Sequence, residues 1–170
     1  DEEDDAYLYW FSADDSVRNW LWDINRADDL LVTVGDRATV LTSRDGAAWN
    51  LEVVPESMTD AILLGVGGNT NMLVSVGNRG HLMTSHNSWT NVVTQNQQGK
   101  SVTNRVNTLG IFWNAVEPAL TENDLQGVTV LNDTWVVTGG KGTVLTTKDG
   151  KKWAKYQAPT SGILTSVEAF

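Results

Sequence analysis

Three basic residues stand out in the sequence as groups that could bind a charged partner. Arg37, Arg79 and Lys141 occupy the same place in three similar segments, between two predicted strands, and each precedes a small residue. Equivalent turns of a repeated structure lie on one face, so we expect the three cations to form an arc. On a chain with a formal net charge of −9, this arc would attract a carboxylate-bearing or otherwise anionic partner, and arginine could bind it with two hydrogen bonds. The alternative is that the turns carry Lys and Arg for solubility, or that each cation pairs with a nearby Asp.

Catalytic chemistry has few candidates. Glycoside hydrolysis needs two carboxylates that face each other across a sugar, and with 21 acidic residues the availability of a pair proves nothing. Asp23, beside Trp22 on a predicted inner strand, is the best single candidate, and the alternative is an Asp that makes only structural hydrogen bonds. His81 and His86 are five residues apart on one predicted strand and so point to opposite faces, which disfavours a shared metal site. We therefore predict no catalytic residue, no metal site and no cofactor, and we expect the chain not to be an enzyme.

The composition is that of a globular protein. With 41% hydrophobic and 19% charged residues, a chain of 170 residues can form one domain with a substantial core. The absence of cysteine excludes disulfides, a thiol nucleophile and cysteine-ligated zinc. The net charge makes nucleic acid an unfavourable partner, and no apolar run approaches 18 residues, so we predict no membrane span. The carboxylate run at residues 1–5 is interpreted as a solvated acidic tail.

An internal repeat predicts the architecture. Three segments share an apolar strand, a Gly-containing turn, a second strand, a polar turn and a tryptophan, and each follows a further apolar run. The segments are 30–49, 72–89 and 135–153, closed by Trp49, Trp89 and Trp153. With the β-prone run after each tryptophan, every unit has four short strands in roughly 40 residues, the size of a propeller blade. We therefore predict an all-β fold of β-propeller blades, each with four antiparallel strands.

The repeat divides residues 6–170, which we interpret as one propeller segment. The stretch at 163–170 is expected to begin a further, partial blade, and Ala6–Phe11 is expected to be a strand left over from a preceding one. The apolar run Leu109–Trp113 lies in a long insertion, which we interpret as a hairpin or loop packed on one face, with a functional or a packing role. The predicted blades cover about 18–55, 58–95 and 122–158, with the insertion at about 96–121.

Three blades and two terminal strands do not close a ring, because propellers usually have at least four blades. Unclosed blades leave sheet faces and edges exposed, which favours aggregation. We therefore expect the chain either to be part of a longer protein, which we favour, or to complete its ring with a second copy or a companion chain.

The polar turns resemble a known repeat. Thr42–Trp49 and Thr146–Trp153 are similar to the Asp box, or BNR repeat, of β-propellers, and most like the repeats of bacterial photosystem II assembly and stability factors. Each Asp sits one place later than in the strict box, and the second unit lacks both Asp and Gly. The resemblance implies structural roles, because Asp can accept backbone N–H groups across a turn, Gly can adopt positive φ, and Trp can cover the joint between strands. The residues concerned are Asp45, Gly46, Trp49, Trp89, Asp149, Gly150 and Trp153.

Two functions remain open at this point. The first is a non-catalytic binding or assembly scaffold that contacts a protein partner through the face carrying the three turn cations. The resemblance supports it, since that family carries arginines on one propeller face for partner binding. The alternative is a piece of a carbohydrate-active propeller (a glycoside hydrolase, a sialidase-like protein or a lectin), in which Trp20, Trp22 and Trp113 would stack on a glycan. We expect a secreted or periplasmic location.

Overall fold

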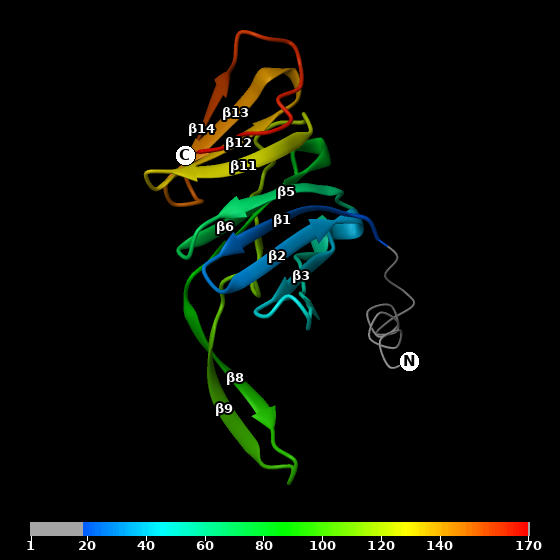
Figure 1. Cartoon of the computed structure of the whole chain (residues 1–170), viewed down its shortest axis with the longest axis vertical. Helices are drawn as coiled ribbons and strands as arrows, with labels where there is room; N and C mark the ends of the chain where they lie inside the picture. The colour runs from blue at the N-terminus through cyan, green and yellow to red at the C-terminus, as the bar shows by residue number, and fades with distance from the viewer. Residues whose placement is uncertain (1–18, 170) are drawn as a thin grey trace, which may run out of the picture.

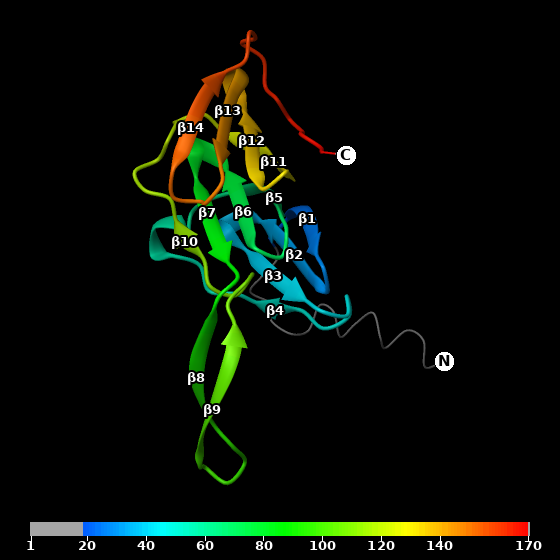
Figure 2. The ribbon, with the colours of Figure 1, turned by 90° about the vertical axis from the view of Figure 1, so that its left-hand side faces the viewer.

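The computed structural model describes residues 19–169, and the part of the chain that it describes is all-β (Figures 1 and 2). Its strands form three four-stranded antiparallel sheets and one separate two-stranded hairpin. The first sheet contains β1 (Leu21–Ala27), β2 (Leu30–Gly35), β3 (Val40–Ser43) and β4 (Asn50–Leu51). The second contains β5 (Leu63–Gly68), β6 (Met72–Gly77), β7 (Leu82–His86) and β10 (Asn114–Ala115). The third contains β11 (Leu125–Leu131), β12 (Thr134–Gly139), β13 (Thr143–Thr147) and β14 (Trp153–Gln157), and the hairpin pairs β8 (Trp89–Gln95) with β9 (Ser101–Asn107).

Short 3-10 turns connect several of these strands. In each sheet such a turn follows the second strand, and a further one, η2 (Glu56–Met58), precedes the second sheet. The turns of the three sheets are η1 (Asp36–Ala38), η3 (Asn78–Gly80) and η4 (Gly140–Gly142). The predicted acidic tail at 1–5 and the predicted strand at 6–11 lie outside the described residues.

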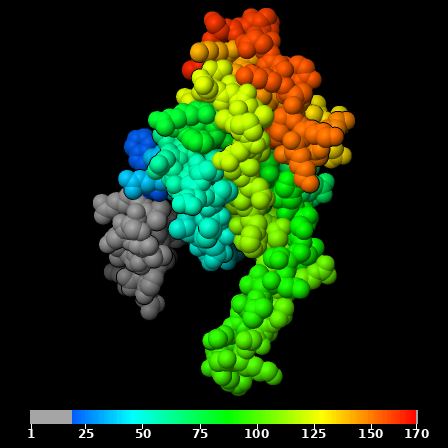
Figure 3. Space-filling view, turned by 180° about the vertical axis from the view of Figure 1, so that it is seen from behind, coloured from blue at the N-terminus to red at the C-terminus, as the bar shows by residue number. Residues whose placement is uncertain are grey.

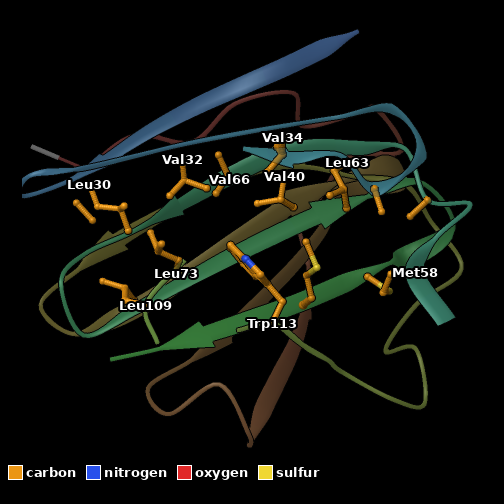
Figure 4. Close-up of a cluster of buried hydrophobic side chains, with 14 residues drawn as sticks. Leu30, Val32, Val34, Val40, Met58, Leu63, Val66, Leu73, Leu109 and Trp113 are labelled. Carbon is orange, nitrogen blue, oxygen red and sulfur yellow. The ribbon is translucent and has the colours of Figure 1, made fainter. Parts of the chain in front are cut away.

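Two hydrophobic clusters hold the three sheets together. Alternate side chains of each strand face a neighbouring sheet, which is the two-residue period of a strand. Between the first and second sheets, Val32 and Val34 pack with Leu63 and Leu73, all four fully buried, and with Trp113 (Figure 4). Between the second and third sheets, the buried residues are Met72, Val74, Val76, Leu82, Leu125, Trp135, Val137 and Leu145.

The first strands of the three sheets lie side by side, with β5 between β1 and β11 (Figure 1). A Cβ at Gly65 would come within 2.5 Å of the carbonyl oxygen of Gln126, so this close approach of two strands requires glycine. The equivalent residue of β1 is Asp23, whose carboxylate accepts a hydrogen bond from the N–H of Val66 (2.8 Å). Asp23 thus joins the first two sheets, which is the structural role that the sequence left as the alternative to a catalytic one.

A tight turn joins the last two strands of the first and third sheets. In the first sheet, the hydroxyl of Ser43 accepts a hydrogen bond from the N–H of Gly46 (2.9 Å), and the indole N–H of Trp49 donates to the carbonyl of Gly46 (3.1 Å). Gly46 has a φ of +77°, a conformation that side chains disfavour. The same two bonds, at 2.9 and 3.0 Å, recur in the third sheet among Thr147, Gly150 and Trp153.

The second sheet makes this turn from residues that are far apart in the sequence. The hydroxyl of Ser85 accepts from the N–H of Gly110 (2.7 Å), and the indole of Trp113 donates to the carbonyl of Gly110 (2.7 Å). Trp113 then leads into β10, which pairs with β7. The run at 89–94, which the sequence predicts as the fourth strand, is instead β8 of the hairpin. The position three residues before Trp89 is His86 and not glycine, whereas Gly110 lies three residues before Trp113 and supplies the required positive φ (+77°), so the turn forms at Gly110. The insertion therefore falls inside the second sheet, between Ser85 and Gly110, and not after residue 95.

The C-terminal segment lies against the third sheet. The sequence predicts the first strand of a further blade at 163–170, and no strand is assigned there within the described residues. The N–H of Leu164 nevertheless donates to the carbonyl of Gly139 (3.0 Å), the residue of β12 that pairs with Leu125 at the start of β11. Ser166 also lies against Gly127 in the way that Gln126 lies against Gly65. Residues 163–167 thus occupy the position beside β11 that β11 holds beside β5.

Candidate functional site

The three turn cations share one backbone conformation. Arg37, Arg79 and Lys141 are the central residues of η1, η3 and η4, and their φ angles are 52°, 53° and 52°. All three side chains are exposed. A residue other than glycine, asparagine or aspartate is uncommon at a φ of this sign, because its Cβ crowds the backbone. Because a cation occupies this unfavourable conformation in all three turns, we consider these turns a candidate binding site.

The residue after each cation explains where the turns lie. Ala38 donates its N–H to the carbonyl of Ala61 (2.7 Å), and Gly142 donates to Gly162 (2.9 Å), so each of these two turns rests on the segment that follows its own sheet. At the second turn, a Cβ on Gly80 would come within 1.8 Å of the carbonyl oxygen of Thr121. Because all three turns dock on the segment that follows their own sheet, they lie at the same end of successive sheets. We call this surface the turn face, defined by Arg37, Arg79 and Lys141.

The carboxylates near the turn face bind groups other than these cations. Within residues 19–169, the ion pair that the structure shows joins Arg44 to Asp29, away from the three turns. Asp124 accepts a hydrogen bond from the backbone N–H of Arg79 (2.8 Å) and not from its guanidinium. Asp36 accepts one from the indole N–H of Trp22 (2.7 Å). The cationic groups of the turn face therefore remain available to a partner.

Two tryptophans extend the turn face beside Arg37. Trp20 and Trp22 are 69% and 47% exposed, and their ring centroids are 5.6 Å apart with the planes tilted by 51°. The N–H of Asp36 donates to the carbonyl of Trp20 (2.9 Å), which fixes this pair to the first turn. The sequence singles out both residues only as glycan-stacking candidates, and their proximity to a turn cation becomes visible in the fold. Trp113, the third such candidate, is 6% exposed and packs between sheets, so it cannot stack on a glycan.

The polar turns between the third and fourth strands are built around two carboxylates. Oδ1 of Asp45 accepts the N–H groups of Ala47 and Ala48, each at 2.9 Å. These bonds stabilise the charged form and lower the pKa of Asp45 below its usual value. The N–H groups of Lys152 and Lys151 lower the pKa of Asp149 in the same way. Both carboxylates are therefore occupied in holding their turns.

Trp89 does not belong to this structural set. Its side chain is 55% exposed, and the guanidinium of Arg105 lies 5.1 Å from its ring centroid. The place that Trp49 and Trp153 hold in their turns is taken in the second sheet by Trp113. The assignment of Trp89 as a structural repeat residue is thereby corrected.

Among the described residues, His81, His86 and Glu52 are further titratable groups with a hydrogen-bond partner or a shifted pKa. His81 precedes β7 and lies with Nδ1 3.2 Å from Oδ1 of Asn78, whereas His86 ends β7, where burial lowers its pKa. Burial raises the pKa of Glu52, a residue that the sequence does not single out, and its carboxylate accepts the hydroxyl of Thr42. The hollow beside Glu52 is also lined by Asp45, which holds its own turn by accepting backbone N–H groups.

Within residues 19–169, no group of three or more His, Cys, Asp or Glu side chains could hold a metal ion. In the same residues, no helix is long and apolar enough to cross a membrane.

Comparison with known proteins shows similarity at the level of structure. No protein-family model and no curated protein matches the chain. A solved structure described as YCF48 bound to D1 peptide superposes with a TM-score of 0.62 and 18% sequence identity, covering 85% of this chain and 43% of that one. A crystal structure of Prp20p from Saccharomyces cerevisiae, whose description adds its binding properties to Gsp1p and histones, superposes with a TM-score of 0.42 and 8% identity, covering 74% of this chain and 32% of that one. The chain thus spans less than half the length of either protein.

The comparison with YCF48 and the sheet topology agree on the class of protein. Successive four-stranded antiparallel sheets, packed face to face with their first strands side by side, are the blades of a β-propeller. The predicted all-β propeller architecture is confirmed.

Proposed function

We propose that this chain is a non-catalytic binding or assembly scaffold of the Asp-box-like propeller type, which contacts a protein partner through the turn face. The observation that carries the proposal is the repetition of an exposed cation at the same left-handed backbone position of three successive blades. Glycine would fit each position at lower conformational cost. Ligand binding explains a cation at this strained position in three blades better than solubility does, since a cation at any neighbouring exposed position would increase solubility equally well.

The chemistry of the turn face favours an anionic protein segment. Arg37 and Arg79 can each bind a carboxylate with two parallel hydrogen bonds, and Lys141 adds a third charge on a chain that is acidic overall. Trp20 and Trp22 stand beside the first cation, and tryptophan and arginine are enriched among residues that dominate protein interfaces. That the similar YCF48 structure is described with a bound D1 peptide supports a protein or peptide partner here.

Charge reversal tests the proposal. The variant Arg37→Glu/Arg79→Glu/Lys141→Glu should lose a partner that the wild-type chain captures, by at least about tenfold in affinity, because attraction becomes repulsion at three contacts. The matched control is Lys148→Glu/Lys151→Glu/Lys152→Glu, which changes the charge equally on exposed residues of a different turn. Equal capture by all three proteins would refute the turn face as the binding site, and equal loss in both variants would reduce it to a net-charge effect.

The Asp-box assignment rests on the turn geometry. In the first and third blades, a Ser or Thr hydroxyl and an Asp carboxylate accept the backbone N–H groups of the turn, and a tryptophan closes it. The second blade keeps the hydroxyl, the glycine and the tryptophan, and the carbonyl of Thr108 replaces the carboxylate by accepting from Ile111 and Phe112. This shared bonding supports a common repeat type across the three blades.

One open sheet face supports the proposal that a further blade packs beside the first. Four apolar residues of the second sheet face the first blade, namely Leu63, Val66, Leu73 and Met83. The residues at the equivalent positions of the first sheet are also apolar, namely Leu21, Ile24, Leu31 and Leu41. In the second sheet all four are at most 3% exposed. In the first sheet, Leu21 is 46% and Ile24 56% exposed. A second copy or a companion chain that supplies this blade should give a complex larger than the monomer in light scattering, and Leu21→Lys/Ile24→Lys should abolish it. A wild-type monomer at all concentrations would contradict this part of the proposal.

A carbohydrate-active propeller remains the second candidate, because the exposed Trp20–Trp22 pair could stack on a sugar. A glycan array and a tryptophan-fluorescence titration of Trp20→Ala/Trp22→Ala against the wild type test it. No glycan-dependent signal in the wild type would end this candidate.

A further inference from the structure

The β8–β9 hairpin is an addition that the second blade does not need. It is inserted into a tight turn, and the blade closes around it through Ser85, Gly110 and β10. At its base, the N–H of Thr108 donates to the carbonyl of Ser88 (2.9 Å), and the hydroxyl of Thr108 donates to the carbonyl of His86 (2.7 Å). Beyond this anchored base the hairpin projects away from the blades (Figures 1–3). We call residues 89–107 the arm.

The outer edge of β9 presents backbone groups that pair with nothing within the described residues. β8 and β9 form a sheet of two strands, so each has one open edge. The N–H of Asn96 donates to the carbonyl of Lys100 at the tip, and Thr108 donates to Ser88 at the base. Because hydrogen-bonded and non-hydrogen-bonded pairs alternate along an antiparallel ladder, these two bonds fix the pattern between them. Ser101, Thr103 and Arg105 occupy non-hydrogen-bonded positions, and their N–H and C=O groups point outward.

The arm is cationic on an acidic protein. The segment 61–116, which includes most of the second blade and the whole arm, contains none of the 21 acidic residues. Two of its three basic residues, Lys100 and Arg105, lie at the start of β9 and within it. An acidic chain placed along the outer edge of β9 would therefore meet two cations and no carboxylate from the arm.

One face of the arm adds an apolar contact surface beside that edge. Cross-strand partners share a face, so the side chains of Thr103 and Arg105 lie on the same side as those of Trp89 and Val93. Trp89 and Val93 are 55% and 64% exposed. The guanidinium of Arg105 stacks over the Trp89 ring, 5.1 Å from its centroid, which holds the cation on this face of the arm.

We propose that the arm binds an extended acidic segment of a partner protein, which adds as a third strand to the outer edge of β9. Backbone hydrogen bonds to Ser101, Thr103 and Arg105 supply the pairing. Lys100 and Arg105 are five residues apart and point to opposite faces, so a carboxylate on each face of the added strand reaches one cation. Charge complementarity selects this partner over the arm of a second copy, because two arms would bring like charges together. The arm is a separate surface from the turn face, so this inference stands or falls independently of the proposed function.

The test uses the complete chain and a defined probe. The probe is an acetylated and amidated heptapeptide, Glu-Glu-Thr-Thr-Thr-Glu-Glu, which carries Glu on both faces of an extended strand, and its counterpart carries Lys in place of Glu. Thr103→Pro removes one outward N–H without removing a β8–β9 hydrogen bond, and Thr103→Ala is the control that keeps this N–H. Lys100→Glu/Arg105→Glu removes the charge complementarity, with Lys148→Glu/Lys151→Glu as the control for net charge.

We expect the wild type, Thr103→Ala and the Lys148/Lys151 control to bind the Glu peptide. Thr103→Pro and the Lys100/Arg105 variant should bind it about tenfold more weakly or not at all. Bound peptide should slow hydrogen exchange at the amides of residues 101, 103 and 105. Equal binding of the Glu and Lys peptides, or unchanged binding by Thr103→Pro and the Lys100/Arg105 variant, would overturn the proposal. A wild-type dimer that Thr103→Pro dissociates would also overturn it, since the edge would then belong to a second copy.

Discussion

Truncating Trp113 should destabilise the fold much more than truncating Trp89. Trp113 is 6% exposed in the cluster between the first two blades, and its indole donates a 2.7 Å hydrogen bond to Gly110. Trp113→Ala should cost about 3–5 kcal/mol for the cavity and lost contacts. The lost indole hydrogen bond should add about 1 kcal/mol. Trp89 is 55% exposed and contacts Arg105, so Trp89→Ala should cost about 1 kcal/mol or less.

Urea unfolding followed by far-UV circular dichroism measures the difference. With a slope of about 2 kcal/mol per M, a loss of about 4 kcal/mol shifts the midpoint down by about 2 M, whereas Trp89→Ala should shift it by about 0.5 M or less. Trp113→Phe, which keeps the ring volume in part, should fall between them and serves if Trp113→Ala does not fold. Equal shifts for the two alanine variants, or a larger shift for Trp89→Ala, would refute the assignment of Trp113 to the repeated turn.

Three further predictions concern the joints between strands and blades. Backbone N–H groups lower the pKa of Asp149 in the folded state. The carboxylate therefore contributes stability above the unfolded pKa of about 3.9, and this contribution is lost as pH falls through the folded pKa. Asp149→Asn should flatten that acid dependence in unfolding curves from pH 5 to 2. Burial lowers the pKa of His86, so stability should begin to fall as pH drops below about 6.5, and His86→Phe should remove this slope between pH 7 and 5. Gly65→Ala would place a Cβ 2.5 Å from the carbonyl oxygen of Gln126 and should cost about 1–3 kcal/mol. Gly140→Ala, whose Cβ would lie at an ordinary contact distance of 3.6 Å from Cβ of Asn123, should cost less, and similar midpoints for the two variants would contradict the close strand approach.

The sequence was sufficient for the fold class because the repeat carries the physical constraints of a blade. Alternating Val and Leu residues such as Val32 and Val34 specify strands that are buried on one face, and glycines at turn positions such as Gly46 specify positive φ. The three turn cations were found by the same alignment, because the small residue after each one is required by the contact with the segment that follows its blade.

The position of the insertion could not be predicted in this way, because Trp89 has nearly the same sequence surroundings as the repeat tryptophans Trp49 and Trp153. It follows a Thr-Ser pair at nearly the repeat spacing and begins a run with high strand propensity. Pairing between segments that are distant in the sequence decides which tryptophan closes the turn, and the local sequence pattern carries no information about such pairing. One signal was available: Gly110 precedes Trp113 by three positions, as Gly46 precedes Trp49, and no glycine precedes Trp89 at that distance.

Other site features depend on tertiary packing alone. Trp20 and Trp22 reach the first turn through the hydrogen bonds to Asp36, and Asp23 meets Val66 across 43 residues of sequence. The raised pKa of Glu52 comes from its partial burial, and the hollow that it lines is shared with residues as distant in sequence as Leu30 and Ile111. Neither these contacts nor the burial of Glu52 can be deduced from residue type or spacing in the sequence.

A hydrogen-exchange footprint of the chain bound to a captured protein partner shows whether the turn face is the binding surface. If the turn face binds the partner, exchange should slow in peptides that contain residues 36–38, 78–80 and 140–142, and should stay unchanged in those that contain 44–48 and 148–152. Protection confined to the latter turns, with the three cationic turns unaffected, would contradict the account.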